Sequence, residues 1–251
     1  MLTRSPPDTQ TNKKQKNKPA TTDQPTNQPA PDNADSVVNG AKAVFVELYA
    51  PWCGHCKSLK PVWASLAAAV AADKDLSSRV TVAKADADAH RAVGDKFGVA
   101  GFPTLKFVPR GRRADAAESY DGGRTHDDLL AFVRAKVAAA ADAARVDALA
   151  PLSRQFLAAK KAADLPAIAA EARAAVEALS ADDGYAGKLA AAEAHAALLA
   201  RAAEKGLVGG EYFEAERARL ERVVASGSVA GGKLEAMVLK ADVLGAILEA
   251  K

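Results

Sequence analysis

Both cysteines of this 251-residue chain lie in the segment APWCGHCKS, at positions 53 and 56. Two thiols at this spacing can bind a metal, form a structural disulfide, attach haem or act as a redox pair. A zinc site needs two further ligands, and the sequence has neither a third cysteine nor histidines at a paired spacing. A disulfide across so short a loop removes little chain entropy. Haem attachment needs a histidine directly after the second cysteine, where Lys57 stands. The spacing therefore favours a redox pair without metal or cofactor.

The position of the pair relative to the next helix predicts which thiol reacts first. A helix begins with unpaired backbone N–H groups and the positive end of its dipole, and both favour a thiolate. We place Cys53 at the first helical position and Cys56 one turn later, where the two sulfurs can meet. Because the thiolate is the nucleophile of disulfide exchange, Cys53 should attack and Cys56 should resolve the mixed disulfide. His55, between them, should stabilise the Cys53 thiolate and favour the reduced form of the pair.

Hydrophobic patterning predicts the elements that position the two cysteines. Between about residues 34 and 138, apolar runs rich in β-branched residues alternate with helical patterns, which is typical of an α/β domain. Pro61 should kink the first helix, because proline removes a backbone donor. The predicted strands are 43–50, 80–86, 104–108 and 118–122, and the predicted helices are 57–70, 90–98 and 126–140.

The pattern changes from about Arg145 onward, where alanine-rich segments are separated by glycine and proline. Their apolar residues recur at helical spacing, which predicts a packed bundle. We interpret His195 as a residue on a helix face, and Tyr212 with Phe213 as core or cap residues, without catalytic roles. The five predicted helices are about 151–163, 166–181, 185–205, 210–226 and 232–250.

The N-terminal segment 1–33 is polar and rich in proline, so we expect a disordered tail. It has no apolar core of the kind that a secretory signal needs, and the chain ends in ILEAK rather than in a KDEL-type signal. The formal net charge of +3 gives no reason to expect nucleic acid as a partner. No apolar run reaches the length of a membrane-spanning helix.

The segment FVELYAPWCGHCKSLKPVW resembles the catalytic domain of protein disulfide isomerases. The similarity continues through AKADA, FGVAGFPTLKFVPRG and YDGGRTHDDLLAFV. Thioredoxins themselves usually have Gly-Pro between the cysteines, so Gly-His points to the isomerase branch. The resemblance implies a thioredoxin-like α/β domain over residues 34–140, with thiol–disulfide exchange as its chemistry.

The resemblance also implies roles for residues outside the cysteine pair. Glu47 and Lys84 match a buried pair on neighbouring strands in which the glutamate accepts the proton of the second cysteine. Arg124 matches an arginine that swings toward that cysteine and lowers its pKa, although an ordinary loop arginine is the alternative.

Three further positions are implied to contact the substrate. Pro103 matches a cis-proline that faces the cysteines and presents backbone to an extended peptide, with an ordinary turn proline as the alternative. Trp52 and Phe102 are expected to contact substrate beside it.

Residues 146–251 resemble the helical D domain of some disulfide isomerases, a five-helix module associated with client binding. Together the two resemblances predict an enzyme that forms, breaks and rearranges disulfides in unfolded client proteins. An upstream oxidase or glutathione would supply or remove electrons. The family resemblance implies the lumen of the endoplasmic reticulum. The alternatives are a client-binding chaperone with secondary redox activity and a general thiol reductase.

Overall fold

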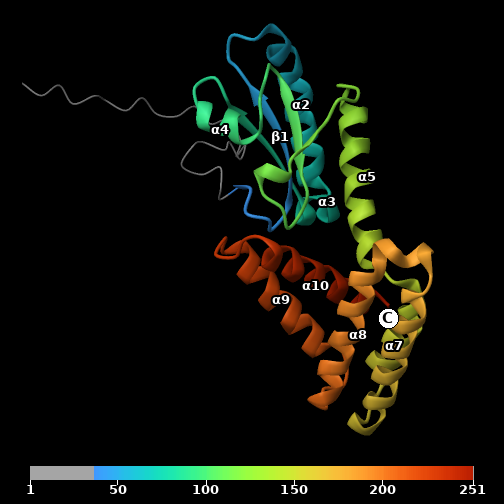
Figure 1. Cartoon of the computed structure of the whole chain (residues 1–251). Coiled ribbons are helices and arrows are strands. Elements are labelled where there is room, and N and C mark those ends of the chain that lie inside the picture. Colours follow the sequence, from blue (N-terminus) through green and yellow to red (C-terminus); the bar gives the residue numbers. More distant parts are fainter. Residues whose placement is uncertain (1–36, 251) are drawn as a thin grey trace, which may run out of the picture.

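The computed structural model describes residues 37–250 of the chain (Figure 1). The tail predicted at residues 1–33 lies outside the described residues. We refer to residues 37–140 as the sheet unit and to residues 146–250 as the helical unit. Each of them has its own hydrophobic core.

The sheet unit contains four strands in the order β2-β1-β3-β4. The central strand β1 (Ala43–Tyr49) is parallel to β2 (Val80–Asp86) and antiparallel to β3 (Thr104–Val108), and β4 (Glu118–Ser119) pairs with β3. Both faces of β1 are covered by helices. A strand in that position is apolar along its whole length rather than at alternate residues, as AVFVELY shows.

Helices cover the two faces of the sheet (Figure 1). Residues of α2 (Gly54–Ala72), α3 (Lys74–Arg79) and α5 (His126–Ala144) share one core with the sheet. The short helix α4 (Arg91–Lys96) belongs to the core on the opposite face. The short turn η1 (Ala114–Ala116) lies between β3 and β4.

The alternation of side chains along β1 decides where Glu47 lies. Phe45 packs on the face covered by α2, with its ring centroid 4.9 Å from that of Trp63. Val44 and Val46 belong to the core on the opposite face. Because successive side chains of a strand point to opposite faces, Glu47 shares the face of Phe45 and of α2.

The predicted strands 80–86 and 104–108 are confirmed, and the predicted strand 43–50 is one residue shorter. Helix α2 begins at Gly54 and continues through Pro61 to Ala72. The predicted strand 118–122 has only two residues in the ladder. The six-residue helix α3 was not predicted. Its N-cap Asp73 accepts hydrogen bonds from the backbone N–H groups of Asp75 and Leu76, a local signal in a segment too short to show periodicity.

The helical unit contains the five predicted helices, but the first ends at Ala158 rather than at 163 and the third begins at Leu189 rather than at 185. The side chains of Phe156 and Phe213 are fully buried at its centre, with ring centroids 5.6 Å apart. Phe213 is therefore a core residue, as predicted. The helices are α6 (Ala150–Ala158), α7 (Leu165–Ser180), α8 (Leu189–Glu204), α9 (Glu211–Ala225) and α10 (Gly232–Glu249), with the 3₁₀ turns η2 (Asp147–Leu149), η3 (Ala162–Asp164) and η4 (Asp183–Lys188) between them.

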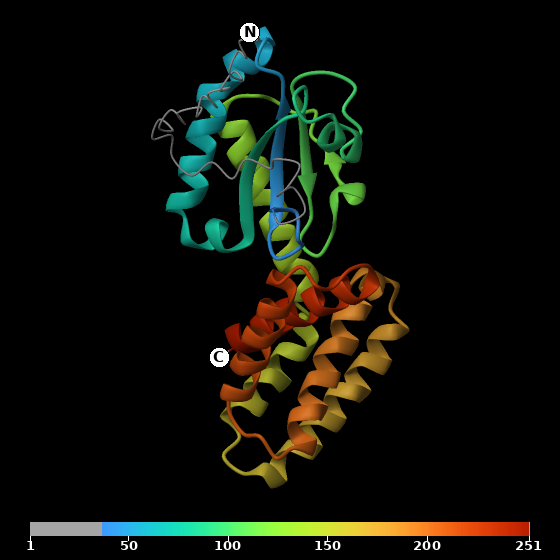
Figure 2. The ribbon, with the colours of Figure 1, turned by 90° about the vertical axis from the view of Figure 1, so that its left-hand side faces the viewer.

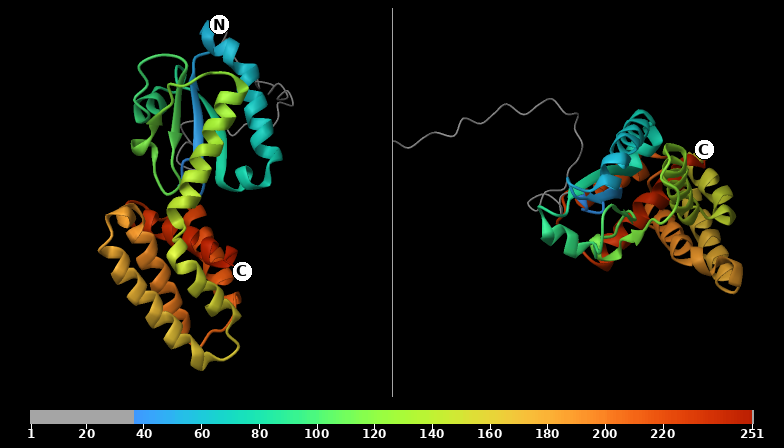
Figure 3. Two further views of the ribbon diagram at one scale, coloured as in Figure 1. Left: turned by 90° about the vertical axis from the view of Figure 1, so that its right-hand side faces the viewer. Right: turned by 90° about the horizontal axis from the view of Figure 1, so that it is seen from above.

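Helix α5 connects the two units without a break (Figure 3). A capping box fixes its start: the Thr125 hydroxyl accepts from the Asp128 backbone N–H, and the Asp128 carboxylate accepts from the Thr125 backbone N–H. Val133 belongs to the core of the sheet unit, whereas Ala144 at the other end belongs to the core of the helical unit. One helix therefore contributes to both cores. Within residues 37–250, no helix is long and apolar enough to cross a membrane.

Candidate active site

Cys53 is the N-cap residue of α2. We predicted it at the first helical position, which Gly54 occupies in the structure. Its sulfur accepts a hydrogen bond from the backbone N–H of Cys56, at 3.4 Å, and lies 3.6 Å from the carbonyl oxygen of Phe102. Hydrogen bonds from the Cys56 thiol, and then from the backbone N–H groups of Cys56 and His55, lower the pKa of Cys53. The N-cap position thus directs the free donors of the helix at one sulfur.

Cys56 lies within the first turn of the same helix and is 4 % exposed. Burial, followed by the hydrogen bond that its thiol donates to Cys53, raises the pKa of Cys56 to about 11. Both cysteines are free thiols in this structure. Cys53 is therefore the more acidic of the two thiols, and Cys56 is protonated at neutral pH.

Glu47 lies near the C-terminal end of β1, two residues before the strand ends, and is 3 % exposed. Burial raises the pKa of its carboxyl group to about 7, and the positive charges of Lys84 and Arg124 oppose that shift. In turn, the Glu47 charge contributes to raising the pKa of Cys56. A carboxyl group with a pKa near 7 can take up or release a proton at neutral pH.

Lys84, predicted to pair with Glu47, and Arg124, predicted to swing toward Cys56, both act on the Glu47 carboxyl group through their charge. Lys84 is the direct neighbour of Glu47 across the parallel β1–β2 ladder and is half-buried. Among the described residues no ion pair or hydrogen bond joins their side chains, so Lys84 acts on the carboxyl group through its charge. Arg124 is exposed, and its charge acts on Glu47 but is not among the groups that shift the pKa of Cys56.

His55 contributes to the site through its backbone. Its N–H group donates to Cys53, whereas its imidazole is exposed and is not among the groups that shift the pKa of Cys53. The stabilisation of the thiolate by the imidazole ring stays a prediction, and the structure adds the backbone N–H of His55 as a donor to the same sulfur.

Trp52, Phe102 and Pro103 form one rim of the site. The Phe102–Pro103 peptide bond is cis, and Pro103 is buried directly before β3. The ring of Trp52 is 65 % exposed and meets Phe102 edge to face, with ring centroids 5.9 Å apart. An exposed tryptophan beside a reactive sulfur is suited to contact a polypeptide.

Two features of this rim were missed in the sequence. Asp88 accepts a hydrogen bond from the Trp52 indole Nε1, at 2.9 Å, and so orients the exposed ring. The signal was present: Asp86, at the end of β2, accepts from the backbone N–H groups of Asp88 and Ala89, a turn that aspartate favours. The carbonyl oxygen of Phe102 was missed because nothing in a residue's identity marks a backbone atom.

No group of three or more histidine, cysteine, aspartate or glutamate side chains among residues 37–250 is arranged to hold a metal ion. The site therefore consists of two thiols, a carboxyl group of raised pKa, a cis-proline and an exposed aromatic rim. Such a set can exchange thiols with disulfides and move the accompanying proton.

Comparison with known proteins finds two family models along the chain. The thioredoxin model matches residues 26–135, and the model of the C-terminal domain of the endoplasmic reticulum protein ERp29 matches residues 144–247. Residues 136–143, which separate the two matches, lie within α5.

Three similar proteins illustrate the extent of the likeness. Protein disulfide isomerase-like 2-1 of Oryza sativa subsp. japonica is 38% identical over 225 residues, covering 85% of this chain and 57% of that protein. Protein disulfide-isomerase tigA of Aspergillus niger is 49% identical over 107 residues, covering 42% and 28%. The solved first thioredoxin domain of mouse protein disulfide-isomerase A4 is 34% identical at a TM-score of 0.38, covering 44% and 74%. The chain spans little more than half the length of its rice relative.

Proposed function

Since the chain belongs to the protein disulfide isomerase family, with a thioredoxin domain followed by an ERp29-type helical domain, we propose that it catalyses thiol–disulfide exchange in client proteins. It forms, breaks and rearranges their disulfide bonds. The observation that carries this proposal is the opposite shift of the two thiols, with the pKa of Cys53 lowered and that of Cys56 raised to about 11.

The first step uses the Cys53 thiolate. It attacks one sulfur of a client disulfide, which forms a mixed disulfide between Cys53 and the client and releases the other client sulfur as a thiolate. The lowered pKa of Cys53 increases the fraction of its thiolate at any given pH. Trp52 and the backbone at Phe102–Pro103 hold the client segment beside the sulfur.

The second step uses Cys56, which must lose its proton before it can attack. Glu47 accepts this proton, directly or through water, because burial has raised its pKa to about 7. The Cys56 thiolate then attacks the Cys53 sulfur, which forms the Cys53–Cys56 disulfide and releases the client as a dithiol. Run in reverse, the same steps oxidise a client dithiol, and an oxidase or the glutathione couple resets the pair.

The remaining roles follow from the family. Arg124, an exposed side chain, approaches Cys56 when the mixed disulfide forms and lowers its pKa. The helical unit contacts unfolded clients. The lumen of the endoplasmic reticulum, named in the matching ERp29 model, is the compartment in which such a pair meets folding disulfides.

The assignment of the attacking thiol is tested by alkylation of the reduced protein with iodoacetamide across a pH series. We expect Cys53 to be labelled before Cys56, with an apparent pKa below the unperturbed value of about 8.5. Peptide mapping of the label identifies the cysteine. Preferential labelling of Cys56 would contradict the mechanism.

The reaction class is tested on a ribonuclease whose disulfides have been scrambled. An isomerase restores its activity, whereas a general thiol reductase consumes the disulfides without restoring it. The Cys56→Ala variant is the matched control, because it can open a client disulfide but cannot release itself by forming the internal one. A chaperone with incidental thiols would restore equal activity with the wild type and with the Cys53→Ala variant.

A further inference from the structure

The helical unit contacts the end of the sheet at which β1 begins (Figure 2). Cys53 follows the end of β1, whereas residues 38–42 precede its start. The loop Pro109–Arg113, which we call the Arg-Gly loop, follows β3. Because β3 is antiparallel to β1, this loop lies beside residues 38–42, at the end of the sheet where β1 begins. The length of β1, seven residues, places that end of the sheet about 20 Å from the cysteines.

Two glycines at this end of the sheet pack against α10. Gly40 and Gly111 are buried, have φ of 84° and 81°, and are joined by a hydrogen bond of 3.0 Å from Gly111 N to Gly40 O. A Cβ atom at Gly40 would lie 2.8 Å from a methyl group of Leu234, and one at Gly111 would lie 3.2 Å from the Cβ of Val238. The close approach of α10 therefore depends on two residues without side chains.

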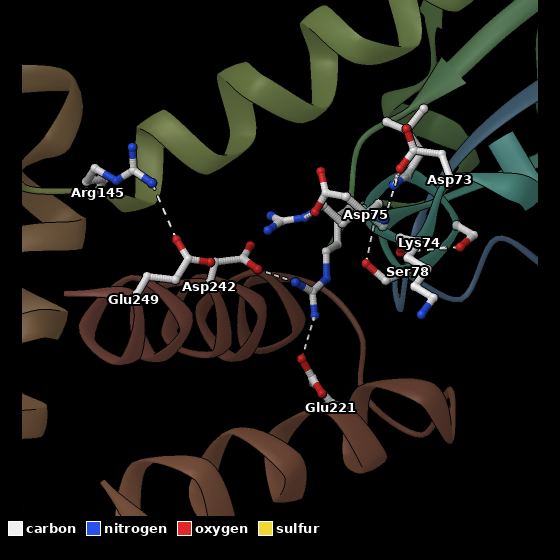
Figure 4. Close-up of polar contacts among 12 residues, drawn as sticks. Asp73, Lys74, Asp75, Ser78, Arg145, Glu221, Asp242 and Glu249 are labelled. Atoms are coloured by element: carbon white, nitrogen blue, oxygen red, sulfur yellow. Dashed lines mark hydrogen bonds and ion pairs between the residues drawn. The ribbon is translucent and has the colours of Figure 1, made fainter. Parts of the chain in front are cut away.

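Arg110 binds both units at once and is 17 % exposed. Its Nε donates to the carbonyl oxygen of Ala41, at 3.0 Å, and its Nη1 donates to the Asp242 carboxylate of α10. Its Nη2 lies 3.8 Å from the Glu221 carboxylate of α9. Figure 4 shows Asp242 and Glu221 reaching toward the same side chain from the two helices. Because the guanidinium group contacts the segment before β1, helix α10 and helix α9, it fixes the relative position of these three segments.

The next two arginines extend this contact. Arg113 donates to the carbonyl oxygen of Val38 at 3.1 Å and to that of Val229, before α10, at 2.9 Å. Arg112 forms an ion pair with Glu235 of α10 at 2.9 Å. An apolar cluster of Val224, Leu234 and Val238, with Ala41 packed against it, adds to the contact between the units.

A second, separate connection runs through α5. Its Ala144 belongs to the core of the helical unit. Arg145, directly after α5, pairs with Glu249 of α10 at 3.4 Å (Figure 4), and Asp142 within α5 pairs with Lys188 at 3.0 Å. Two bodies joined at a single hinge can rotate, whereas two bodies joined along a helix and at a second packed contact cannot.

We propose that the sheet unit and the helical unit form one rigid body in solution, locked by packing of the Arg-Gly loop and Gly40 against α9 and α10. The helical unit is then held at the end of the sheet opposite the cysteines. A client that contacts both units must span at least the length of the sheet, so short peptides engage only one of them. The rigid body does not depend on the proposed redox activity, whereas its consequence for clients rests on the proposed function.

The test measures residual dipolar couplings of backbone amides in the full-length protein. In a rigid body one alignment tensor fits the couplings of both units. We expect this result for the wild type, with the relative orientation shown in Figure 3. Two different tensors in the wild type would overturn the proposal.

The lock is tested by Gly111→Asn, with Gly98→Asn as its matched control. Asparagine tolerates positive φ better than most residues, so the backbone cost is similar at the two sites. Gly98 has φ of 62°, and a Cβ atom added there would have nothing within 4 Å, whereas one added at Gly111 would meet Val238. We expect loss of the common tensor in Gly111→Asn and its retention in Gly98→Asn.

Arg113→Ala provides a second variant in case Gly111→Asn fails to fold, since it removes only hydrogen bonds between the two units and within this end of the sheet unit. The expected result is again loss of the common tensor. If each folded variant at Gly111 or Arg113 keeps the common tensor, the Arg-Gly loop is not the lock.

Discussion

The sheet unit and the helical unit each bury a titratable side chain, and burial shifts the pKa values of these two side chains in opposite directions. Glu47 of the sheet unit is 3 % exposed, and burial raises its pKa to about 7. His195 of the helical unit is 2 % exposed, and burial lowers its pKa to about 4. In both cases burial favours the neutral form, which is the carboxylic acid for one and the free imidazole for the other.

Glu47 and His195 differ more in their surroundings than in the size of their pKa shifts. Glu47 acts on the pKa of Cys56 and is itself acted on by Lys84 and Arg124, so its proton has a reactive neighbour. His195 is held by a hydrogen bond of 2.6 Å between its Nε2 and the hydroxyl of Ser153, and its Nδ1 has no partner. Both of these residues lie in the core of the bundle. A perturbed pKa therefore marks a functional site only where a reactive group shares the environment.

The largest expected effect is on the turnover of Glu47→Gln. The amide keeps the shape of the side chain but cannot accept a proton, so resolution by Cys56 should slow about 100-fold or more. Attack by Cys53 should change little, and mixed disulfides should accumulate. Stopped-flow reduction of a disulfide peptide, followed by acid quench and mass spectrometry, counts the trapped adducts.

A purely electrostatic role for Glu47 predicts the reverse. Its negative charge contributes to raising the pKa of Cys56, so its removal would make Cys56 more acidic and speed resolution. Wild-type or faster turnover without trapped adduct would therefore exclude Glu47 as the proton acceptor. The same variant with Lys84→Met distinguishes the loss of the base from the effect of an unpaired lysine.

The next largest effects concern the free energy of unfolding, to which His195 and Glu47 contribute with opposite dependences on pH. The pKa of His195 is lowered, so its contribution is present above pH 6.5 and is lost as the pH falls through about 4. The pKa of Glu47 is raised, so its contribution is present below pH 4.5 and is lost as the pH rises through about 7. Each shift corresponds to about 3 kcal/mol.

Urea unfolding at several pH values measures both contributions. Relative to His195→Gln, the wild type should lose about 3 kcal/mol of unfolding free energy between neutral pH and about pH 4. Relative to Glu47→Gln, it should lose a similar amount as the pH rises over the same range. If the unfolding free energies of wild type and variant depend on pH in the same way, the residue does not titrate with a shifted pKa.

The smallest effect is expected for Ser153→Ala. This change removes the hydroxyl that hydrogen-bonds to His195 and leaves both nitrogens of the buried ring without a partner. The cost should be about 2 kcal/mol of unfolding free energy, with disulfide exchange unchanged. Thermal unfolding and the peptide assay together check it. A loss of exchange activity would mean that the helical core and the redox site are coupled.

The sequence predicted the redox site better than the contact between the units. The apolar strand around Glu47, the Gly-His spacing and the cis-proline motif are local signals, and residues near one another in the chain carry them. The hydrogen bond between Ser153 and His195 was not predictable, because a buried face and an exposed face of an alanine-rich helix look alike in composition. Arg110 and Asp242 are 132 residues apart, and nothing in either segment identifies its partner.

The interface also escaped prediction for a physical reason. Gly40 and Gly111 both have positive φ, a backbone conformation that glycine adopts readily. Their second role, which is to let α10 approach, is set by the arrangement of the two units and not by local preference. The domain boundary predicted at residue 140 lies inside α5, which continues to Ala144.

Continuity of α5 constrains how the length of this chain can change. Each residue added to an α-helix rotates everything beyond it by about 100° and advances it by about 1.5 Å. A single insertion between Val137 and Ala144 would therefore turn the helical unit away from the Arg-Gly loop. An insertion of seven residues, about two turns, would restore the angle but move the unit about 10 Å away from the sheet. Insertions and deletions should consequently be rare in this stretch of α5, whereas the exposed turns between the helices of the bundle have no such phase to preserve.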